Sequence, residues 1–424
     1  MTRLFRKLTR VEEALSVFSN RIRPLRSERV ELQSALGRVL AEDLFSPIDM
    51  PPYDRVAFDG YAVKASDTFG ASPENPVVLR VVGNALPGRE FEGELRGMDA
   101  VEVATGAPMP RGADAVVPLE YVRRTGDFVT VLRQVAPGAN VDRAGSDFSK
   151  GELVLRKGTY LGPFELLALA SLNVTHVPVV LRPKVCLIAS GDELVELGSE
   201  LERGKVVNSN VIGVSALIEG LAEVSYLGIC KDELDSLRET IAKCSECDLI
   251  VTIAGSSVGE RDYLSEAVES LGGEVLVHGL SIMPGRPTML AIVRDKPLIG
   301  LPGYPVSAMI AAMEVLIPVL QMLLGIDGSQ VRTVLKAKLS RRVPSSPGVR
   351  HYVRVKLVRE RGVLKAVPLR VGGAGIVSSL VKSDGFLIIP EEVEGYEEGT
   401  DVDVVVFRRW LRIEEGLQGA QELG

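Results

Sequence analysis

The sequence predicts a multidomain α/β protein with a central, parallel-type α/β domain. Between residues 184 and 324, apolar strand-like runs alternate with helical patterns, which is typical of parallel βαβ units. Segments rich in Gly, Pro and Asp interrupt this alternation at residues 189–193, 254–262, 284–287 and 301–305. Because ligands of open α/β sheets bind at the carboxyl ends of the strands, we expect these four segments to surround one crevice.

The hydrophobic periodicity predicts the individual elements. In the α/β region we expect strands at residues 185–189, 223–228, 249–253 and 298–301, and helices at 210–219, 233–242, 263–271 and 306–324. Further helices are expected at residues 8–22, 27–40 and 163–172. Short β-like runs at residues 77–82, 100–103, 115–118 and 128–132 predict a β-rich module inserted into this helical region. After residue 328, runs at 351–358, 364–369, 386–389 and 401–407 predict a small β-barrel or sandwich.

Length and composition limit the class of protein. A chain of 424 residues predicts two to four domains, and 46% apolar with 25% charged residues is ordinary for a folded protein. The net charge of −7 argues against binding to nucleic acid or to an anionic membrane surface. Residues 1–10 lack an apolar core of the signal-peptide kind, so we expect a cytoplasmic protein.

The run at residues 306–324 is apolar enough to span a membrane. It contains Glu314, Pro318 and Gln321 and directly follows one of the Gly/Pro-rich turns. These features favour a buried helix over a membrane span.

The four cysteines allow two interpretations. Cys186 lies inside an apolar run, which predicts a core residue, and Cys230 stands alone. Cys244 and Cys247 have the C-x-x-C spacing of a redox pair or half a zinc site, but no second C-x-x-C exists. We therefore favour an incidental or structural-disulfide role over metal binding.

The first and second loops of the crevice combine anion-binding groups with carboxylates. Ser190 and the Gly191 amide suit a phosphate or a ring substituent, while Asp192 and Glu193 can hold a hard cation. Ser257 and Gly259 precede a helix, where exposed amides favour anions. Asp262 would repel such an anion unless Mg²⁺ bridged the two. A simple turn and plain helix capping would explain the same residues without a ligand.

The third and fourth loops are stiff. Arg286 stands on a turn between two prolines and suits bidentate contact with an oxyanion. Pro302, Gly303 and Pro305 form a strand-to-helix turn whose backbone can approach a ligand closely. A rigid loop without a ligand would explain each of them as well. Outside the α/β region, a Pro- and Asp-rich segment at residues 51–62 presents Asp59.

Six motifs in order resemble those of a known family. They are PPYDRVAFDGYA at residues 51–62, TGAPMPRGA at 105–113, GANVDRAGSD at 138–147, SGDEL at 190–194, SVGERD at 257–262 and LPGYPVSA at 301–308. Together they resemble the molybdopterin molybdenumtransferase family, the MoeA-type proteins that include the gephyrin E domain. The resemblance extends from residue 8 to about residue 407.

The resemblance implies a domain layout and an assembly. It implies a discontinuous helical domain I at residues 1–49 and 148–180, a β-rich domain II at 50–147, a molybdopterin-binding α/β domain III at 181–327, a β-barrel domain IV at 328–410 and a tail at 411–424. It also implies a homodimer whose active site lies between domain III of one protomer and domain II of the other. Upstream cofactor-synthesis enzymes are further expected partners.

The resemblance also implies a reaction. Molybdate, or tungstate, would be inserted into adenylylated molybdopterin with release of AMP, aided by Mg²⁺. The implied catalytic residues are Asp59, Thr105, Glu193, Asp232 and Asp262, of which the last three would hold the metal. The implied cofactor-binding residues are Ser190, Gly191, Ser257, Gly259, Arg286, Pro302, Gly303 and Pro305.

The sequence departs from the family pattern at cationic positions. Met283 stands where the family usually has a lysine, and Gly279 where another is common, while Arg286 keeps a cation nearby. Ala374 stands near a serine of some members. These changes leave open a tungstate-specific enzyme or a less active paralogue. The sequence is also compatible with a molybdopterin adenylyltransferase-like enzyme or with a non-catalytic, molybdopterin-binding scaffold.

Overall fold

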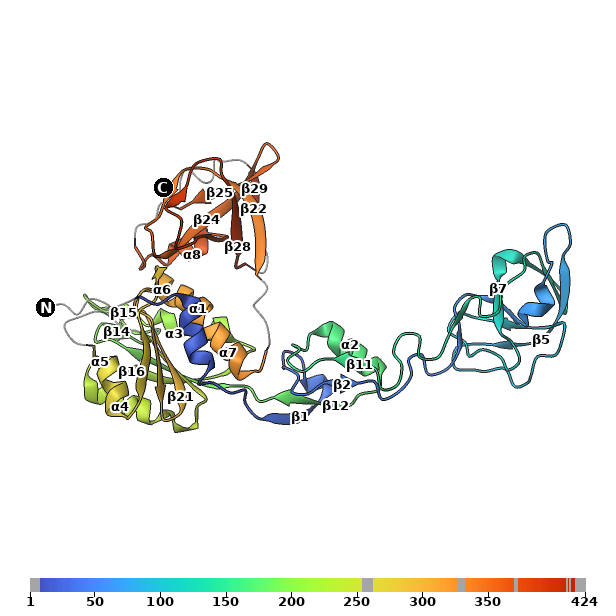
Figure 1. Cartoon of the computed structure of the whole chain (residues 1–424), viewed down its shortest axis with the longest axis horizontal. Helices are drawn as coiled ribbons and strands as arrows, with labels where there is room; N and C mark the ends of the chain where they lie inside the picture. The colour runs from blue at the N-terminus through green and yellow to red at the C-terminus, as the bar shows by residue number, and fades with distance from the viewer. Residues whose placement is uncertain are drawn as a thin grey trace. The chain divides into compact units, whose positions relative to one another are not determined.

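A computed structural model describes residues 8–253, 262–326, 332–369, 373–408, 411 and 413–415 (Figure 1). These residues fall into two compact units. Unit 1 consists of Met1–Glu28, Gly37–Val39 and Val180–Gly424, and unit 2 of Arg29–Leu36 and Leu40–Val179. Ser257 and Gly259, two of the predicted cofactor-binding residues, lie outside the described part of the chain.

The centre of unit 1 is a six-stranded sheet. Its strands follow the order β16 (Glu223–Cys230), β13 (Lys184–Ser190), β17 (Leu249–Ile253), β21 (Lys296–Leu301), β20 (Met289–Val293) and β18 (Glu274–His278). The first four are parallel, as predicted, and β20 runs antiparallel to both its neighbours. In the register Ser190 is opposite Cys230 and Ile253 is opposite Leu301, so the carboxyl ends of the four parallel strands are level. Strands β18 and β20 were not predicted from the sequence.

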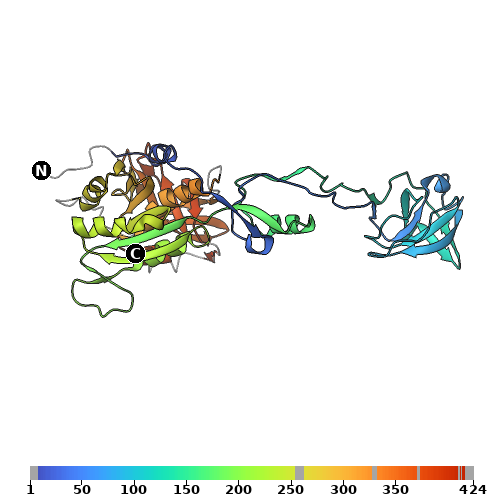
Figure 2. The ribbon, with the colours of Figure 1, turned by 90° about the horizontal axis from the view of Figure 1, so that it is seen from below.

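Helices cover both faces of this sheet (Figures 1 and 2). Along β13, Val185, Leu187 and Ala189 enter one core, while Cys186 and Ile188 enter the other, as the two-residue period of a strand requires. The first core includes residues of α1 (Val11–Ser19), α3 (Ser209–Ile218), α6 (Pro305–Ala311) and α7 (Ile317–Leu323), and the second includes residues of α4 (Leu234–Ala242) and α5 (Tyr263–Ser270).

The apolar run predicted as a buried helix is confirmed. Residues Pro305–Leu323 form one 19-residue helix with a mean hydropathy of 1.9, the only described helix long and apolar enough to cross a membrane. A π-helical turn, Ala312–Leu316, joins α6 to α7. In the most apolar stretch of this helix, 72% is buried inside the protein. Its single carboxylate, Glu314, pairs with Arg332 at 2.6 Å, which offsets the cost of burying the charge.

The C-terminal strands of unit 1 close into the expected barrel. Its strands are β24 (Arg350–Glu360), β25 (Val363–Pro368), β22 (Thr333–Leu339), β28 (Asp401–Val406) and β26 (Gly385–Ile389), which pairs back with β24. The short strands β19 (Ile282–Met283) and β29 (Glu414–Glu415) also pair with β24. Smaller elements of unit 1 are β14 (Leu194–Val195), β15 (Val206–Val207), β23 (Val343–Pro344), β27 (Gly395–Tyr396), α8 (Ser378–Lys382) and a 3-10 turn at Cys244–Glu246.

Unit 2 contains the predicted β-rich module. A curved sheet has the order β7 (Ala115–Pro118), β4 (Gly60–Val63), β6 (Asp99–Val103), β5 (Val77–Ala85), β9 (Phe128–Val131) and β8 (Val122–Thr125). Three two-stranded sheets pair β1 (Ser27–Glu31) with β12 (His176–Val180), β2 (Leu44–Phe45) with β11 (Leu153–Leu155), and β3 (Arg55–Val56) with β10 (Val141–Asp142). The predicted helix at 163–172 is present as α2 (Pro163–Ser171), and 3-10 turns occupy Leu32–Ser34, Ala65–Thr68 and Leu119–Tyr121.

The predicted helix at residues 27–40 is wrong. The segment forms β1 followed by a 3-10 turn, and Gly37 has a φ of 75°, which a right-handed helix does not allow. Val30 and Leu32 pack into a cluster with Val177 and Val179 of the strand opposite. Pairing with a strand distant in the sequence therefore outweighs the local helical spacing.

A disulfide joins Cys186 to Cys247, with a Cα–Cα distance of 5.9 Å. The prediction that Cys186 is a core residue is confirmed, and the structure adds that this buried residue is cross-linked. Cys230 and Cys244 are buried free thiols. A structural disulfide was among the predicted roles, but the C-x-x-C spacing gave no indication of its partner.

We expect this disulfide to contribute about 4 kcal/mol to the unfolding free energy, because it closes a long loop in the unfolded chain. The two cysteines are 61 residues apart. Denaturant unfolding with and without a reductant measures the contribution. The Cys247→Ser variant is the control, since the reductant should leave its stability unchanged. An identical midpoint for oxidised and reduced wild-type protein would contradict the expectation.

Candidate functional site

The first loop of the crevice leaves β13 at Ser190, whose side chain is buried. Gly191 has a φ of 155°, and a Cβ there would lie 2.7 Å from Glu193 Oε2. The carboxylate of Glu193 therefore folds over the Gly191 backbone, and the positive φ of this residue favours glycine. Asp192 is held by its carbonyl, which accepts a hydrogen bond from Lys205 Nζ at 2.7 Å. This loop presents two carboxylates at the edge of the sheet.

Asp232 follows the neighbouring strand β16 and faces the same edge. Ser190 Oγ donates to Asp232 Oδ1 over 3.4 Å. Burial raises the pKa of the Asp232 carboxyl, and the negative charges of Asp192, Glu193 and Asp262 raise that pKa further. Carboxylates from three different loops therefore interact at one end of the sheet, as the sequence predicts.

Asp262 begins α5. Its Oδ1 accepts a hydrogen bond from Ser265 N at 3.3 Å, which caps the helix. Its Oδ2 lies 3.2 Å from Nε2 of His278, the last residue of β18. Asp262 is therefore both a helix cap and a residue of the crevice.

The described residues contain no group of three or more His, Cys, Asp or Glu side chains arranged to hold a metal ion. Glu193, Asp232 and Asp262 interact electrostatically but do not converge as ligands within this part of the chain. Their role as metal ligands stays a prediction. The concentration of negative charge is nevertheless of the kind that a hard cation neutralises.

The turn after β21 is fixed by neighbours on two sides. Asn210 Nδ2 donates to Gly303 O at 2.7 Å, and Val306 N donates to Ala374 O at 3.0 Å. Pro305 is the first residue of α6. The Val306 amide, which a ligand at this helix end would otherwise use, is thus occupied by the barrel. The predicted contacts of Pro302, Gly303 and Pro305 with a cofactor stay predictions.

The turn carrying Arg286 is shaped by its own backbone. The Arg286 carbonyl accepts hydrogen bonds from Leu280 N at 2.8 Å and Thr288 N at 2.9 Å, and the side chain is exposed. Gly285 lies against α6, since a Cβ there would be 3.6 Å from Ser307 O. The turn therefore lies between α6 and strand β24 of the barrel, with which β19 pairs.

A cavity of about 700 Å³ lies between this turn and the barrel. Its described lining residues are Met283, Pro284, Arg341, Arg342, Val343, Pro344, His351, Val353, Arg354, Pro368, Leu369, Gly373 and Ala374. Three arginines and a histidine line it, and none of these described lining residues is a carboxylate. Arg342 also pairs with Glu397 at 3.1 Å. We call this cavity the cationic pocket.

In the cationic pocket Arg354 is buried and His351 is partly buried. Burial lowers the pKa of His351, and the nearby charge of Arg354 lowers it further. Within the described residues His351 Nδ1 has no hydrogen-bond partner. The pocket was not predicted from the sequence. The sequence feature that could have indicated it is the presence of three arginines, Arg341, Arg342 and Arg354, in or near the barrel strands.

In unit 2 the structure brings the first three motifs together. Val56 N donates to Ala107 O at 2.9 Å, Gly106 N donates to Val56 O at 2.8 Å, and Val56 is opposite Val141 in the β3–β10 pair. Asp59 Oδ1 accepts from Thr105 N at 2.7 Å and from Thr105 Oγ1 at 2.8 Å. These hydrogen bonds lower the pKa of the Asp59 carboxyl. The exposed carboxylate is therefore ionised and oriented.

Three family descriptions cover most of the chain. They are the MoeA N-terminal region (domain I and II) at residues 9–173, the probable molybdopterin binding domain at 186–322 and the MoeA C-terminal region (domain IV) at 336–407. The molybdopterin molybdenumtransferase of Bacillus subtilis is 36% identical over 389 residues, which cover 90% of each chain. The chain belongs to the MoeA family.

Further relatives of this family agree. The molybdopterin molybdenumtransferase of Haemophilus influenzae is 33% identical over 392 residues, which cover 92% of this chain and 96% of the relative. The molybdopterin biosynthesis MoeA protein of Pyrococcus horikoshii has a solved structure with a TM-score of 0.81 and 36% identity, covering 95% of this chain and all of that one. As a MoeA-family member, the chain is an enzyme of the transferase class with a role in molybdenum cofactor biosynthesis.

Proposed function

We propose that the protein inserts molybdate into adenylylated molybdopterin with release of AMP. The observation that carries the proposal is the presence of two oppositely charged sites in unit 1. Carboxylates gather at the end of the parallel strands, and the cationic pocket lies beside the 283–287 turn. An oxometalate dianion suits the second site and a divalent cation suits the first. The family relationship supports the same reaction.

The carboxylate crevice would hold Mg²⁺ through Glu193, Asp232 and Asp262. Burial raises the pKa of Asp232 most, and repulsion by the neighbouring carboxylates raises it further; a bound cation would relieve that repulsion. Mg²⁺ would supply charge neutralisation at the phosphorus as AMP leaves. Ser190 and Gly191, with Ser257 and Gly259 from the second loop, would contact the phosphate or the pterin of the substrate.

The cationic pocket would hold the oxometalate. Guanidinium groups bind oxyanions through paired N–H donors, and a cavity of about 700 Å³ has room for the anion and part of the pterin. Arg341, Arg342 and Arg354 would supply the charge that Met283 does not, and Arg286, exposed on the neighbouring turn, would supply a further cation. Molybdate and tungstate share shape and charge, so both are candidate substrates.

We expect the Asp192→Asn variant to retain Mg²⁺ binding at a lower pH than the wild type. The charge of Asp192 is one cause of the raised pKa of Asp232, so its removal lowers that pKa. Asp232 then stays ionised further into the acid range, and the pH at which Mg²⁺ binding is half lost moves down. Mg²⁺ titrations across a pH series measure the shift. A shift to higher pH would contradict the assignment.

The proposed assembly is a cytoplasmic homodimer with the domain boundaries that the resemblance implies. On α2 of unit 2, Phe164 is 82% exposed and Leu167 is 68% exposed, on one face of the helix. Such side chains are typical of surfaces that another chain covers. In the dimer, Asp59 and Thr105 of one protomer would complete the crevice of the other. Upstream cofactor-synthesis enzymes would be transient partners.

The test of the function is AMP release from adenylylated molybdopterin by the purified protein with Mg²⁺ and either molybdate or tungstate. Release that depends on the oxometalate supports the proposal, and the more effective anion identifies the physiological metal. Adenylylation of molybdopterin from ATP would instead indicate an adenylyltransferase. Tight pterin binding without release of AMP would indicate a scaffold or a paralogue that carries the cofactor.

A further inference from the structure

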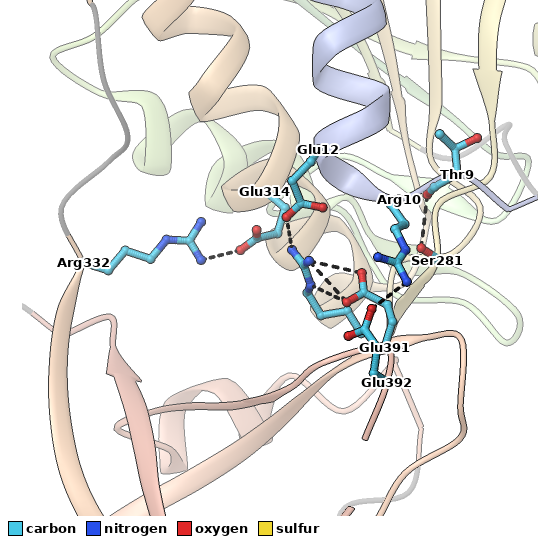
Figure 3. A network of polar contacts seen from close by, with 9 residues as sticks. Thr9, Arg10, Glu12, Ser281, Glu314, Arg332, Glu391 and Glu392 are labelled. Carbon is cyan, nitrogen blue, oxygen red and sulfur yellow. Dashed lines mark hydrogen bonds and ion pairs between the residues drawn. The ribbon is translucent and has the colours of Figure 1, made fainter. Parts of the chain in front are cut away.

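Arg350 joins three segments of unit 1 that are distant in the sequence. It is the first residue of β24, and its Nη1 donates to Glu12 Oε1 of α1 at 2.7 Å. Its Nη2 lies 3.1 Å from Glu391 Oε1, and its Nε donates to Glu391 Oε2 at 3.3 Å. Figure 3 shows the network of polar contacts to which Glu12 and Glu391 belong. We call Arg350, Glu12 and Glu391 the clamp.

The clamp coincides with a backbone junction. Arg350 N donates to Ser281 O at 2.8 Å, and Ser281 N donates to Thr9 O at 2.9 Å. In the parallel pair of β19 and β24, Ile282 is opposite Arg350 and Met283 is opposite His351. The segment before α1, β19 and β24 therefore lie side by side, held at the position of the clamp.

The next residues of these two strands line the cationic pocket. Met283 and Pro284, from β19 and the turn after it, and His351 and Arg354 of β24 all line the pocket. The register that Arg350 shares with Ile282 thus sets how these two groups of lining residues are placed relative to each other. A slip of β24 along β19 would move His351 and Arg354 together.

The clamp depends on Arg350 because Glu391 is buried. The Glu391 side chain is 3% exposed and Glu12 is 65% exposed. The paired carboxylates raise the pKa of Arg350, although burial opposes the shift. Removing the guanidinium would leave the Glu391 charge buried without this partner, which favours movement of the strand. A second ion pair across the same boundary, Arg10 with Glu392 at 2.6 Å, is exposed at both ends and offers a matched control.

We propose that Arg350 is a positioning residue for the oxyanion, acting through the clamp on the relative position of the lining residues of β19 and β24. This inference rests on the proposed binding of the oxometalate in the cationic pocket. Arg350 is not among the described lining residues, so its effect is transmitted through β24 and not by direct contact. Sites of this kind require supporting contacts that hold the binding groups to within a fraction of an ångström.

The decisive variant is Glu12→Ala. For this variant, a purely electrostatic effect and a positioning effect predict opposite changes in the affinity for the anion. Loss of a negative charge near a cationic pocket would tighten anion binding if only the electrostatic field mattered. Loss of a clamp contact would weaken anion binding if the clamp positions the lining residues of β19 and β24. The matched control is Glu392→Ala, which removes one negative charge from the same boundary but leaves the clamp intact. Glu12 is exposed, so its removal leaves no buried charge.

The measurement is calorimetric titration of the full-length protein with tungstate, together with KM and kcat for the oxometalate in AMP release. We expect Arg350→Met to weaken tungstate binding about tenfold or more, since small displacements of binding groups have large effects. KM should rise by a similar factor with little change in kcat. Arg350→Lys should recover part of the affinity, Glu12→Ala should weaken binding, and Glu392→Ala should not.

The outcomes separate this inference from the function on which it rests. Absence of tungstate and molybdate binding by the wild-type protein would overturn both. If the wild type binds the anion and Glu12→Ala binds tungstate as tightly as Glu392→Ala or more tightly, the positioning role alone would be overturned. If Arg350→Met does not fold, Glu12→Ala and Arg350→Lys decide the question in the same way.

Discussion

The Asp59→Ala variant should lose at least about 100-fold in the rate of AMP release while it keeps its fold. Asp59 is exposed, so its removal creates no cavity and leaves no buried charge. Its carboxylate is oriented by two hydrogen bonds from Thr105, at 2.7 and 2.8 Å. An exposed side chain held in this way contributes to function more than to stability. Steady-state AMP release and thermal unfolding measure the two effects separately.

The controls for Asp59 distinguish its orientation from its charge. Thr105→Val removes the hydroxyl donor and should lower the rate less than Asp59→Ala does, while Thr105→Ser should restore most of it. Glu74→Gln removes another exposed carboxylate of unit 2 and should leave the rate unchanged. Wild-type activity in Asp59→Ala would remove this residue from the site. A large loss of thermal stability would show that its role is structural.

The Asp232→Asn variant should raise the Mg²⁺ concentration for half-maximal activity at least about tenfold. Asp232 is the residue on which the charges of Asp192, Glu193 and Asp262 act. The substitution removes one ligand and relieves repulsion within the crevice. The metal-free protein should therefore unfold at the same temperature as the wild type or at a higher one. Loss of metal binding combined with a gain in stability is the expected signature of a functional charge cluster.

The matched control for Asp232 is Asp235→Asn. Asp235 lies in the first turn of α4, is largely exposed and pairs with Arg238 at 3.0 Å. Its substitution should not change the Mg²⁺ dependence. If Asp232→Asn has the Mg²⁺ dependence of the wild type, the metal is held elsewhere, and the proposed ligand set of Glu193, Asp232 and Asp262 is wrong.

The sequence was sufficient for the elements with uninterrupted apolar patterns. The runs that form β13, β17 and β21 are buried almost throughout, and their polar residues follow the strand ends. The carboxylates of the crevice could be predicted for this reason. The sequence does not predict β20 although this strand is as apolar as its neighbours, because the Gly- and Pro-rich segment before it has the pattern of a site loop rather than of a connection between strands.

Two features could not be predicted because distant segments create them. The cationic pocket requires β19 to pair with β24, and the two strands are separated by more than sixty residues that carry no local sign of this pairing. The strand at Ser27–Glu31 depends on pairing with His176–Val180, which a helical spacing of apolar residues conceals. The disulfide partner of Cys247 could not be predicted for the same reason: Cys186 is distant in the sequence and has the local pattern of a core residue.

The measurement that tests the central claim most directly is a single-turnover reaction with adenylylated molybdopterin, Mg²⁺ and molybdate, in which AMP and pterin-bound molybdenum are quantified together. We expect both products to appear with the same rate and in equal amounts, and neither to appear when molybdate is omitted. Release of AMP at the same rate without an oxometalate, or with no metal bound to the pterin, would contradict the proposed reaction.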